Sequence, residues 1–204
     1  MTLRIIGGDY RRRQLRTPHG LSTRPYTDRV RQIVFDRLSD RIENARVADV
    51  FSGVGTMGLE SLSRGAQSCV FIEGDSKVHQ LLSENVSAIA ADKPTICWKT
   101  NIHRTSFCPN GAEQCLPFDV VFFDPPYDQC SLLAPSEVLG KGLVRLAKPR
   151  ATYEDALIVL RTPERVEFPD SRAWIVDEHW SISTMNLWLL KKREVCDESP
   201  AAPS

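Results

Sequence analysis

The stretch that decides the fold is VADVFSGVGTMG, residues 47–58. Its first five residues form a mostly apolar run that predicts a buried strand, and the other seven bring three glycines to the start of a predicted helix. Gly53, Gly55 and Gly58 have the spacing of a nucleotide-binding loop, in which glycine lets the backbone turn tightly and come close to a ligand. The pattern alone is weak evidence, because a tight strand-to-helix turn without a ligand has the same residues.

Glu73 adds weight to the ligand-binding interpretation of this loop. It follows a second apolar run, Cys69–Ile72, and stands 20 residues after Gly53. A carboxylate at such a strand end accepts hydrogen bonds from both hydroxyl groups of a ribose. Taken alone, Glu73 is better explained as a solvated charge, but together with the glycine loop it indicates an adenosine-containing cofactor.

Beyond this loop, short apolar runs alternate with helical patterns, as in a parallel sheet covered by helices. The predicted strands are Val47–Phe51, Cys69–Ile72, Thr95–Trp98, Phe118–Phe123, Ala156–Leu160, Trp174–Val176 and Asn186–Leu190. A short connection joins the last two and predicts an antiparallel end to the sheet. The predicted helices are a segment from Thr27 with an apolar stripe to Ile42, then Met57–Arg64, Lys77–Ala91 and Leu132–Leu146.

The tetrapeptide Asp124-Pro125-Pro126-Tyr127 follows a predicted strand and indicates the chemistry. Two consecutive prolines fix the backbone and remove two N–H donors, so the site offers a carboxylate and carbonyl oxygens beside an aromatic ring. The exocyclic amine of a nucleobase has the matching donors, and it is a poor nucleophile because its lone pair is conjugated into the ring. A turn that merely ends a strand is the alternative interpretation.

Asp124 and the Pro125 carbonyl are therefore predicted to accept the two N–H groups of such an amine. These hydrogen bonds raise the electron density on the nitrogen and aim its lone pair at a methyl sulfonium. Tyr127 is predicted to stack on the base, an interaction worth about 1 to 3 kcal/mol.

The first 31 residues are strongly basic. They contain eight arginines and two acidic residues, whereas the whole chain balances 26 basic with 26 acidic residues, so the remainder is net acidic. This split predicts an arm that binds a polyanion. The glycine pair Gly7-Gly8, between Leu3–Ile6 and Arg11–Arg16, predicts a small hairpin at its start. Any single arginine is explained as a solvated charge, but eight so close together favour nucleic acid.

The bulk composition limits the class of protein. A chain of 204 residues suits one domain with a short appendage. No apolar run approaches the roughly 20 residues that span a bilayer, and the first six residues are too short and polar for a signal peptide, so we expect a cytoplasmic protein with no membrane contact. The six cysteines show no CxxC pair and no histidine at zinc-ligand spacing, so neither a metal site nor a disulfide framework is indicated.

The chain resembles the bacterial 16S (small-subunit) ribosomal RNA guanine-N2 methyltransferases over nearly its whole length. The stretches that carry the resemblance are RIIGG at 4–8, TRP at 23–25, TDRVR at 27–31, DVFSGVG at 49–55, GLESLSRGA at 58–66 and DPPY at 124–127. DPPY is shared by many amino-methyltransferases, whereas the stretches before residue 32 occur in far fewer families.

The resemblance implies an α/β class I methyltransferase fold, which is Rossmann-like. Its seven-stranded, mostly parallel sheet has helices on both faces and an N-terminal hairpin and helix extension. It also implies methyl transfer from S-adenosylmethionine to the exocyclic N2 of a guanine in ribosomal RNA, within a small-subunit particle. We expect a monomer with an RNA-contact extension at 1–31, the methyltransferase domain at 32–193 and a disordered tail at 194–204.

The same resemblance implies roles for individual residues. Those expected to bind the cofactor are Asp49, Phe51, Ser52, Gly53, Gly55, Glu73, Asn101, Thr27 and Arg29. Those expected to hold the target guanine for catalysis are Asp124, Pro125, Pro126 and Tyr127. Those expected to contact RNA are Arg4, Arg11, Arg12, Arg13, Arg16, Arg24 and Arg31. The segment 27–31 is expected to close over the methionine end of the cofactor.

Three features depart from the family pattern. Asn101 is the candidate near the third strand end for meeting the adenine amine, through its side-chain oxygen. Tyr26 stands where a smaller polar residue is expected, and SGVG at 52–55 replaces the commoner alanine and serine. These changes concern cofactor fit more than reaction type, and the stretch 100–117 matches nothing diagnostic.

Four other functions share part of this pattern. A nicotinamide-dependent oxidoreductase has the glycine loop but leaves DPPY unexplained and needs a substrate domain. A DNA adenine-N6 methyltransferase shares the chemistry but needs a domain that reads DNA sequence. A protein-glutamine methyltransferase more often has Asn at the position of Asp124, and a non-catalytic RNA-binding module needs only the arm.

Overall fold

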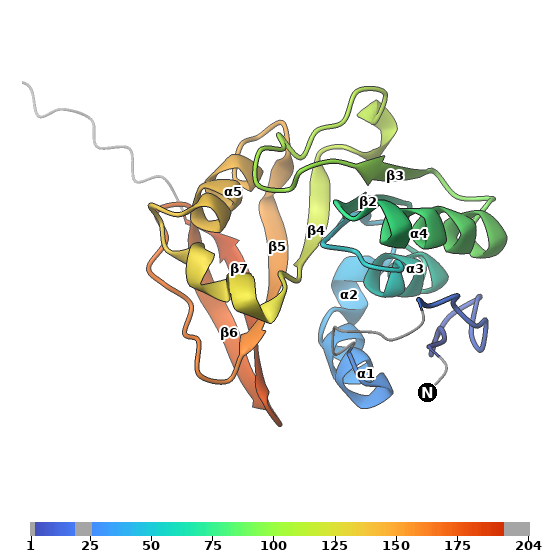
Figure 1. The fold of residues 1–204 in the computed structure, drawn as a ribbon, viewed down its shortest axis with the longest axis horizontal. Helices are drawn as coiled ribbons and strands as arrows, with labels where there is room; N and C mark the ends of the chain where they lie inside the picture. The colour runs from blue at the N-terminus through green and yellow to red at the C-terminus, as the bar shows by residue number, and fades with distance from the viewer. Residues whose placement is uncertain (1–2, 19–25, 194–204) are drawn as a thin grey trace, which may run out of the picture.

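The computed structural model describes residues 3–18 and 26–193, and its centre is a seven-stranded sheet (Figure 1). The strands are β1 (Arg46–Val50), β2 (Ser68–Glu73), β3 (Thr95–Lys99), β4 (Phe118–Phe123), β5 (Thr152–Pro163), β6 (Trp174–Ile182) and β7 (Met185–Lys192). Their order in the sheet is β3-β2-β1-β4-β5-β7-β6, and only β7 runs antiparallel to its neighbours within the described residues. The predicted mostly parallel seven-stranded sheet is confirmed.

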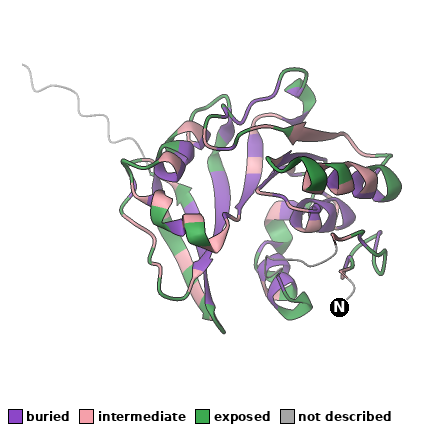
Figure 2. Ribbon diagram, viewed as in Figure 1, coloured by how far each residue is buried: buried purple, intermediate pink, exposed green. Residues whose placement is uncertain are grey.

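Helices cover both faces of this sheet. They are α1 (Asp28–Arg37), α2 (Ser39–Ile42), α3 (Thr56–Ser63), α4 (Ser76–Ile89) and α5 (Val138–Leu146), with short 3₁₀ helices η1 (Glu113–Cys115) and η2 (Tyr127–Leu133). Neighbouring residues of one strand point to opposite faces, so Phe122 packs on the side of α1 to α4 and Phe123 on the side of α5. Because both faces are covered, β4 is buried almost throughout, and β5 is buried from Ala156 to Thr162 after an exposed start at 153–155 (Figure 2).

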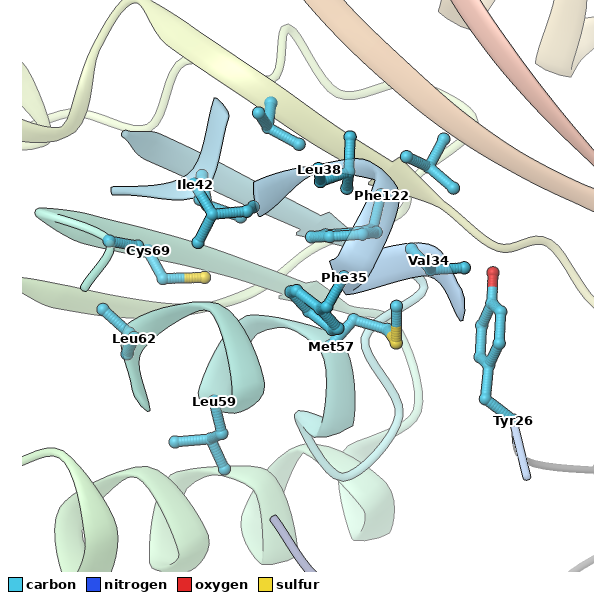
Figure 3. Close-up of a cluster of buried hydrophobic side chains, with 14 of the residues drawn as sticks. Tyr26, Val34, Phe35, Leu38, Ile42, Met57, Leu59, Leu62, Cys69 and Phe122 are labelled. Carbon is cyan, nitrogen blue, oxygen red and sulfur yellow. The ribbon is translucent and has the colours of Figure 1, made fainter. Parts of the chain in front are cut away.

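The first core lies between the sheet and the helices α1 to α4 (Figure 3). The stripe predicted from residue 30 to residue 42 forms it, since Val34, Leu38 and Ile42 are buried there. Figure 3 shows Phe35 beside Phe122 of β4, and their ring centroids are 5.7 Å apart. This packing fixes α1 against the strand that carries the predicted catalytic residues.

The stretch 100–117, which matched no sequence pattern, completes the second core. Phe107 and Cys115 of this stretch are fully buried and pack with residues of α5 against β4. Arg145 of α5 donates to the carbonyl oxygens of Thr105 and His103, at 2.8 and 3.0 Å. An irregular segment therefore takes the place that a helix has in many parallel sheets.

The predicted N-terminal hairpin is present as a narrow antiparallel ladder. The amide of Ile5 donates to the carbonyl of Arg13 at 3.0 Å, and the amide of Leu15 donates to the carbonyl of Leu3 at 2.9 Å. The hairpin is held on α3 by Glu60, whose two carboxylate oxygens each accept a backbone N–H at 2.8 Å, from residues 6 and 7. This buried carboxylate therefore joins the arm to the body of the protein.

Two local predictions were wrong. The helix predicted over Leu132–Leu146 is broken into η2 and α5, because Pro135 has no N–H and pushes Ala134 before it into an extended conformation, with ψ of 146°. Strands β5 and β6 are also several residues longer than predicted.

The tail 194–204 and Arg24 lie outside the described residues. No helix within the described ranges combines the length and the apolar character needed to cross a membrane.

Candidate active site

The carboxyl ends of β1, β2 and β4 meet beside an open cleft of about 730 Å³. The chain leaves β1 toward β2 on one side and returns to β4 on the other, and in open α/β sheets ligands bind at this reversal of strand order. The residues that line the cleft are Phe51, Glu73, Gly74, Asp75, Lys99, Thr100, Asn101, Ile102, His103, Pro126 and Gln129.

The loop after β1 has the backbone geometry that its glycines predict. Gly53 and Gly55 have φ of 55° and 89°, in the left-handed region that favours glycine. A Cβ on Gly53 would meet nothing within 4 Å, so the backbone there is open to a ligand. A Cβ on Gly58 would instead collide with the ring of Phe71, so this glycine serves the close packing of α3 on β2. Gly53 and Gly58 thus differ in function: the first leaves room for a ligand and the second allows a helix to pack closely on the sheet.

Glu73, which we expected to serve one cofactor site together with the glycine loop, is in direct contact with that loop. One carboxylate oxygen of Glu73 accepts the amide of Gly53 at 2.9 Å, and the other accepts the amide of Asp75 at 2.8 Å. Asn101 is exposed and lines the same cleft, and its side-chain oxygen accepts the amide of His103 at 3.0 Å. The predicted carboxylate and amide therefore face one cleft.

Asp49 and Ser52 lie beneath this surface rather than along it. Asp49 is 2% exposed and accepts the amide of Gly58 at 2.8 Å, which fixes the first turn of α3. Burial raises its pKa to about 8, against the opposing effect of that hydrogen bond. The Ser52 hydroxyl is buried and has no hydrogen-bond partner within the described part of the chain.

The tetrapeptide after β4 places its carboxylate next to an arginine that the sequence reasoning missed. Asp124 accepts the Nε–H of Arg161 at 2.6 Å, and its own amide donates to the carbonyl of Val50 at 3.2 Å. Burial raises the pKa of Asp124, and the Arg161 charge opposes that rise. Pro126 lines the cleft, and Pro125 is buried behind it.

Two tyrosines complete this corner. The Arg161 guanidinium lies 4.3 Å from the ring centroid of Tyr26 and 5.3 Å from that of Tyr127. Tyr26 is 4% exposed and its hydroxyl is buried without a hydrogen-bond partner among the described residues. Figure 3 shows its ring standing beside Val34, with the hydroxyl pointing toward the strands.

The model of the family described as Conserved hypothetical protein 95 matches residues 3–187. The chain belongs to this family. A Bacillus subtilis (strain 168) protein, provisionally named the rRNA methyltransferase YlbH, is 30% identical over 169 residues, which are 83% of this chain and 87% of that protein. Ribosomal RNA small subunit methyltransferase D of Escherichia coli (strain K12) is 39% identical over 125 residues, which are 61% of this chain and 60% of that protein.

A solved structure extends the likeness to the whole fold. An Escherichia coli protein, provisionally named the methyltransferase yhhF, superposes with a TM-score of 0.75 at 28% identity and covers 95% of this chain and 99% of its own. Together with the observed strand order, this superposition confirms the class I methyltransferase fold that the sequence predicted.

The segment 27–31 lies at the start of α1. We expected this segment to close over the methionine end of the cofactor. Thr27 is the N-cap of α1, and its hydroxyl accepts the amide of Val30 at 3.3 Å. Arg29 is exposed on the same helix, and neither residue is among those that line the cleft. Their expected contact with the cofactor stays a prediction.

The arginines expected to bind RNA differ in their surroundings. Arg31 is 0% exposed, and its guanidinium donates to the carbonyl of Arg4 and to Asp28, both at 2.7 Å. Its placement corrects our expectation of an RNA contact, because a buried side chain offers no surface to a large polyanion. Arg11 and Arg12 are exposed on the hairpin.

Three further arm arginines are exposed but tied to neighbours. Arg4 pairs with Asp28 at 3.2 Å and Arg16 pairs with Glu84 at 2.7 Å. Arg13 donates to the carbonyl of Ile89 at 2.9 Å. The exposed ion pairs of Arg4 and Arg16 are weak, so these two guanidinium groups remain open to exchange their partners for phosphates.

Proposed function

We propose that this protein transfers a methyl group from S-adenosylmethionine to the exocyclic N2 of a guanine in small-subunit ribosomal RNA. The observation that carries the proposal is the Asp124-Pro125-Pro126-Tyr127 corner, which adjoins the glycine loop and Glu73 at the carboxyl edge of a class I methyltransferase sheet. Family membership and the names of the two relatives support ribosomal RNA as the substrate.

The residues of the cleft fit the cofactor. Glu73 accepts the ribose hydroxyl groups, and the open backbone at Gly53 allows the cofactor to approach closely. Asn101 lines the cleft and offers its amide oxygen to the adenine amine. S-adenosylmethionine, when bound, supplies a methyl group on a positively charged sulfur.

The chain itself orients and activates the target amine. The Asp124 carboxylate and the Pro125 carbonyl accept the two N–H groups of guanine N2, so the nitrogen lone pair becomes more available and points toward the methyl group. With the cofactor held by Glu73, Gly53 and Asn101, its methyl carbon would pass from the sulfur to this nitrogen, and the sulfur would be left as a neutral thioether. The nitrogen then loses a proton, which the neighbouring Asp124 carboxylate accepts, and Tyr127 holds the base by stacking.

The RNA side of the site is the basic arm. Arg4, Arg11, Arg12, Arg13 and Arg16 are exposed on the hairpin and contact phosphates, whereas the buried Arg31 is left out of this surface. Arg16 connects the arm to the cofactor loop, because its backbone bonds both polar groups of Asn85, which also donates to the carbonyl of Val54 at 3.1 Å. We infer that the protein acts as a monomer in the cytoplasm. Its arm binds the RNA of a small-subunit ribosomal particle and so places the target guanine near the cleft.

One experiment tests this function. Purified protein, S-adenosylmethionine with a labelled methyl group and undermethylated small-subunit particles are incubated, and the modified nucleoside is identified by mass spectrometry. Label in N2-methylguanosine is expected, and label in another nucleoside or none contradicts the proposal. The Asp124→Ala variant should lose roughly a hundredfold or more in turnover with cofactor affinity near normal, and Asp124→Asn should retain part of the activity.

A further inference from the structure

Arg161 is brought to the catalytic corner by the register of the sheet. In the parallel pair of β4 and β5, Phe123 lies opposite Leu160, so the next residue on each strand, Asp124 and Arg161, are also neighbours. Their side chains extend to the face covered by α1 and meet at 2.6 Å, between Nε and a carboxylate oxygen. This contact is nearly dry, since the two side chains are only 7% and 16% exposed.

Aromatic rings shield this ion pair from water. The guanidinium lies within cation–π distance of both Tyr26 and Tyr127, and Tyr26 comes from the segment that precedes α1. An arginine suits this position, because its planar group stacks on rings and pairs with a carboxylate at the same time, which a lysine ammonium does less well. Strand register, ion pairing and stacking thus fix Arg161 independently of one another.

We propose that Arg161 is a positioning residue for methyl transfer: it holds the Asp124 carboxylate ionised and fixed in place at neutral pH, as the target amine requires. This inference rests on the proposed function. A protonated Asp124 would present a hydroxyl donor where an acceptor is needed, and the amine would lose a hydrogen bond that activates it. Arg161 itself need not touch the base.

The charges around Asp124 single out Arg161 for this role. Burial favours the neutral carboxylic acid, and the group that opposes it is the Arg161 cation. The other titratable groups that act on Asp124 or share its electrostatic surroundings are Tyr26 before α1, Asp49 of β1, and Tyr127 and Cys130 of η2. None of these groups is a cation, and burial raises the pKa of Tyr26, Asp49 and Cys130, which keeps all three protonated at pH 7.

The test compares Arg161→Gln and Arg161→Lys with the unchanged full-length protein. The Asp124 carboxyl carbon is followed by carbon-13 NMR against pH, and its signal is assigned by its absence in Asp124→Asn. Turnover and cofactor affinity are measured over the same pH range. Arg165→Gln, which changes an exposed arginine in the loop after β5, is the matched control.

In Arg161→Gln the Asp124 titration should move to higher pH by about one unit or more. Turnover at pH 7 should fall by about tenfold and recover as the pH is raised, with cofactor affinity within about twofold of normal. Arg161→Lys should give a smaller shift of the same sign. If the Gln variant fails to fold, the Lys variant tests the proposal by itself. In that variant the Asp124 titration and the low-pH part of the curve of turnover against pH must shift together.

Two outcomes are distinguishable. An unchanged Asp124 titration, or a loss of turnover equal at every pH, overturns the role of Arg161, since an arginine that only supports the fold would give that result. A shifted titration in a protein that transfers no methyl group to RNA overturns the proposed function and leaves the control of Asp124 by Arg161 in place.

Discussion

At the scale of single residues, Glu73 shows how one carboxylate prepares a site before the ligand arrives. Both of its oxygens already accept backbone amides, so its position is fixed and it holds the glycine loop at the same time. A ribose adds its hydroxyl groups to oxygen atoms that still have lone pairs available. Less side-chain freedom is therefore lost on binding than for a mobile carboxylate.

Replacing Glu73 by Ala should weaken S-adenosylmethionine binding by about 1.5 to 3 kcal/mol, the usual loss for hydrogen bonds to a charged group. Titration calorimetry measures this change. Glu178→Ala removes a carboxylate of β6 that pairs with Arg37 on the surface, and it should leave the affinity unchanged. Equal affinity of Glu73→Ala and the unchanged protein would exclude Glu73 from the cofactor site.

The sequence predicted that Glu73 and the glycine loop belong to one cofactor site, but it could not predict the contact of Arg161 with Asp124. The first pair follows from a known spacing between a loop and the next strand end. The second pair is 37 residues apart, and its contact depends on the register of β4 with β5, which shifts at an irregularity between Phe118 and Val120. Counting residues along the chain does not reveal such a shift.

At the scale of elements, Asp49 joins β1 to the first turn of α3 through a buried hydrogen bond to the amide of Gly58. Carboxylates at helix N-termini are usually stabilising because they are charged. Here burial outweighs that effect and raises the pKa of Asp49 to about 8, with Asp124 and Glu73 adding to the rise. The protonated acid is thus the form that the folded protein favours at neutral pH.

This raised pKa makes stability depend on pH in the direction opposite to that of most carboxyl groups. In the unfolded chain Asp49 loses its proton near pH 4, whereas in the folded chain it keeps the proton until about pH 8. The folded state binds more protons between these values, so the free energy of unfolding should fall as the pH rises from about 5 to 8. The Asp49→Asn variant keeps an acceptor for Gly58 but does not titrate, so its stability should change less over this range.

Urea unfolding of both proteins across this pH range measures the difference. Asp177→Asn, at an exposed carboxylate of β6 that pairs with Lys191, is the control and should follow the unchanged protein. Stability curves of Asp49→Asn and the unchanged protein that run parallel with pH would show that Asp49 is not protonated in the folded state.

Helices and strands were predictable where apolar residues recur at a regular spacing, and they were not predictable where this spacing is absent. Strands β1 to β4 and the helices α1, α3 and α4 follow their apolar patterns closely, whereas β5 and β6 extend beyond theirs. The stretch 100–117 has no period, because its few buried residues, such as Phe107 and Cys115, fill the second core singly from an irregular backbone. The cleft residue His103 comes from this stretch, so no pattern could have assigned it.

At the scale of the whole molecule, the arm arginines that the structure describes divide into the buried Arg31, whose side chain holds the arm on the body, and others whose side chains are exposed. Arg31 extends from α1 and contacts both the hairpin and Glu60 of α3. The Glu60 carboxylate is 3.6 Å away and equally buried. Charge counting predicted a basic arm but could not make this division, because every arginine contributes the same charge to the sum. Only burial separates them.

Arg31→Ala should therefore destabilise the protein by about 1 to 3 kcal/mol, since it leaves the Arg4 carbonyl without this donor and removes one of the two cations beside the buried Glu60 carboxylate, which keeps Arg64 at 2.8 Å. Urea unfolding measures the loss. Arg29→Ala changes an exposed arginine of the same helix and should stay within about 0.5 kcal/mol of the unchanged protein. If Arg31→Ala is as stable as Arg29→Ala, the buried pair does not hold the arm.

The outward-facing arginines should instead determine RNA affinity. Replacing both Arg11 and Arg12 by Ala should weaken binding to small-subunit particles without changing stability or cofactor affinity, because both side chains are exposed on the hairpin. Each phosphate contact releases counterions, so the slope of log affinity against log salt should become shallower by about 0.7 for each lost contact to single-stranded RNA.

The matched control replaces Arg165 and Arg172, two exposed arginines between β5 and β6, and removes the same total charge. If RNA responded only to overall charge, both double variants would lose the same affinity and salt dependence. A loss confined to the Arg11 and Arg12 variant supports the arm as the RNA surface. An unchanged salt slope and Michaelis constant in that variant would make the hairpin arginines a solvated surface, and the phosphate contacts would have to come from another face of the protein.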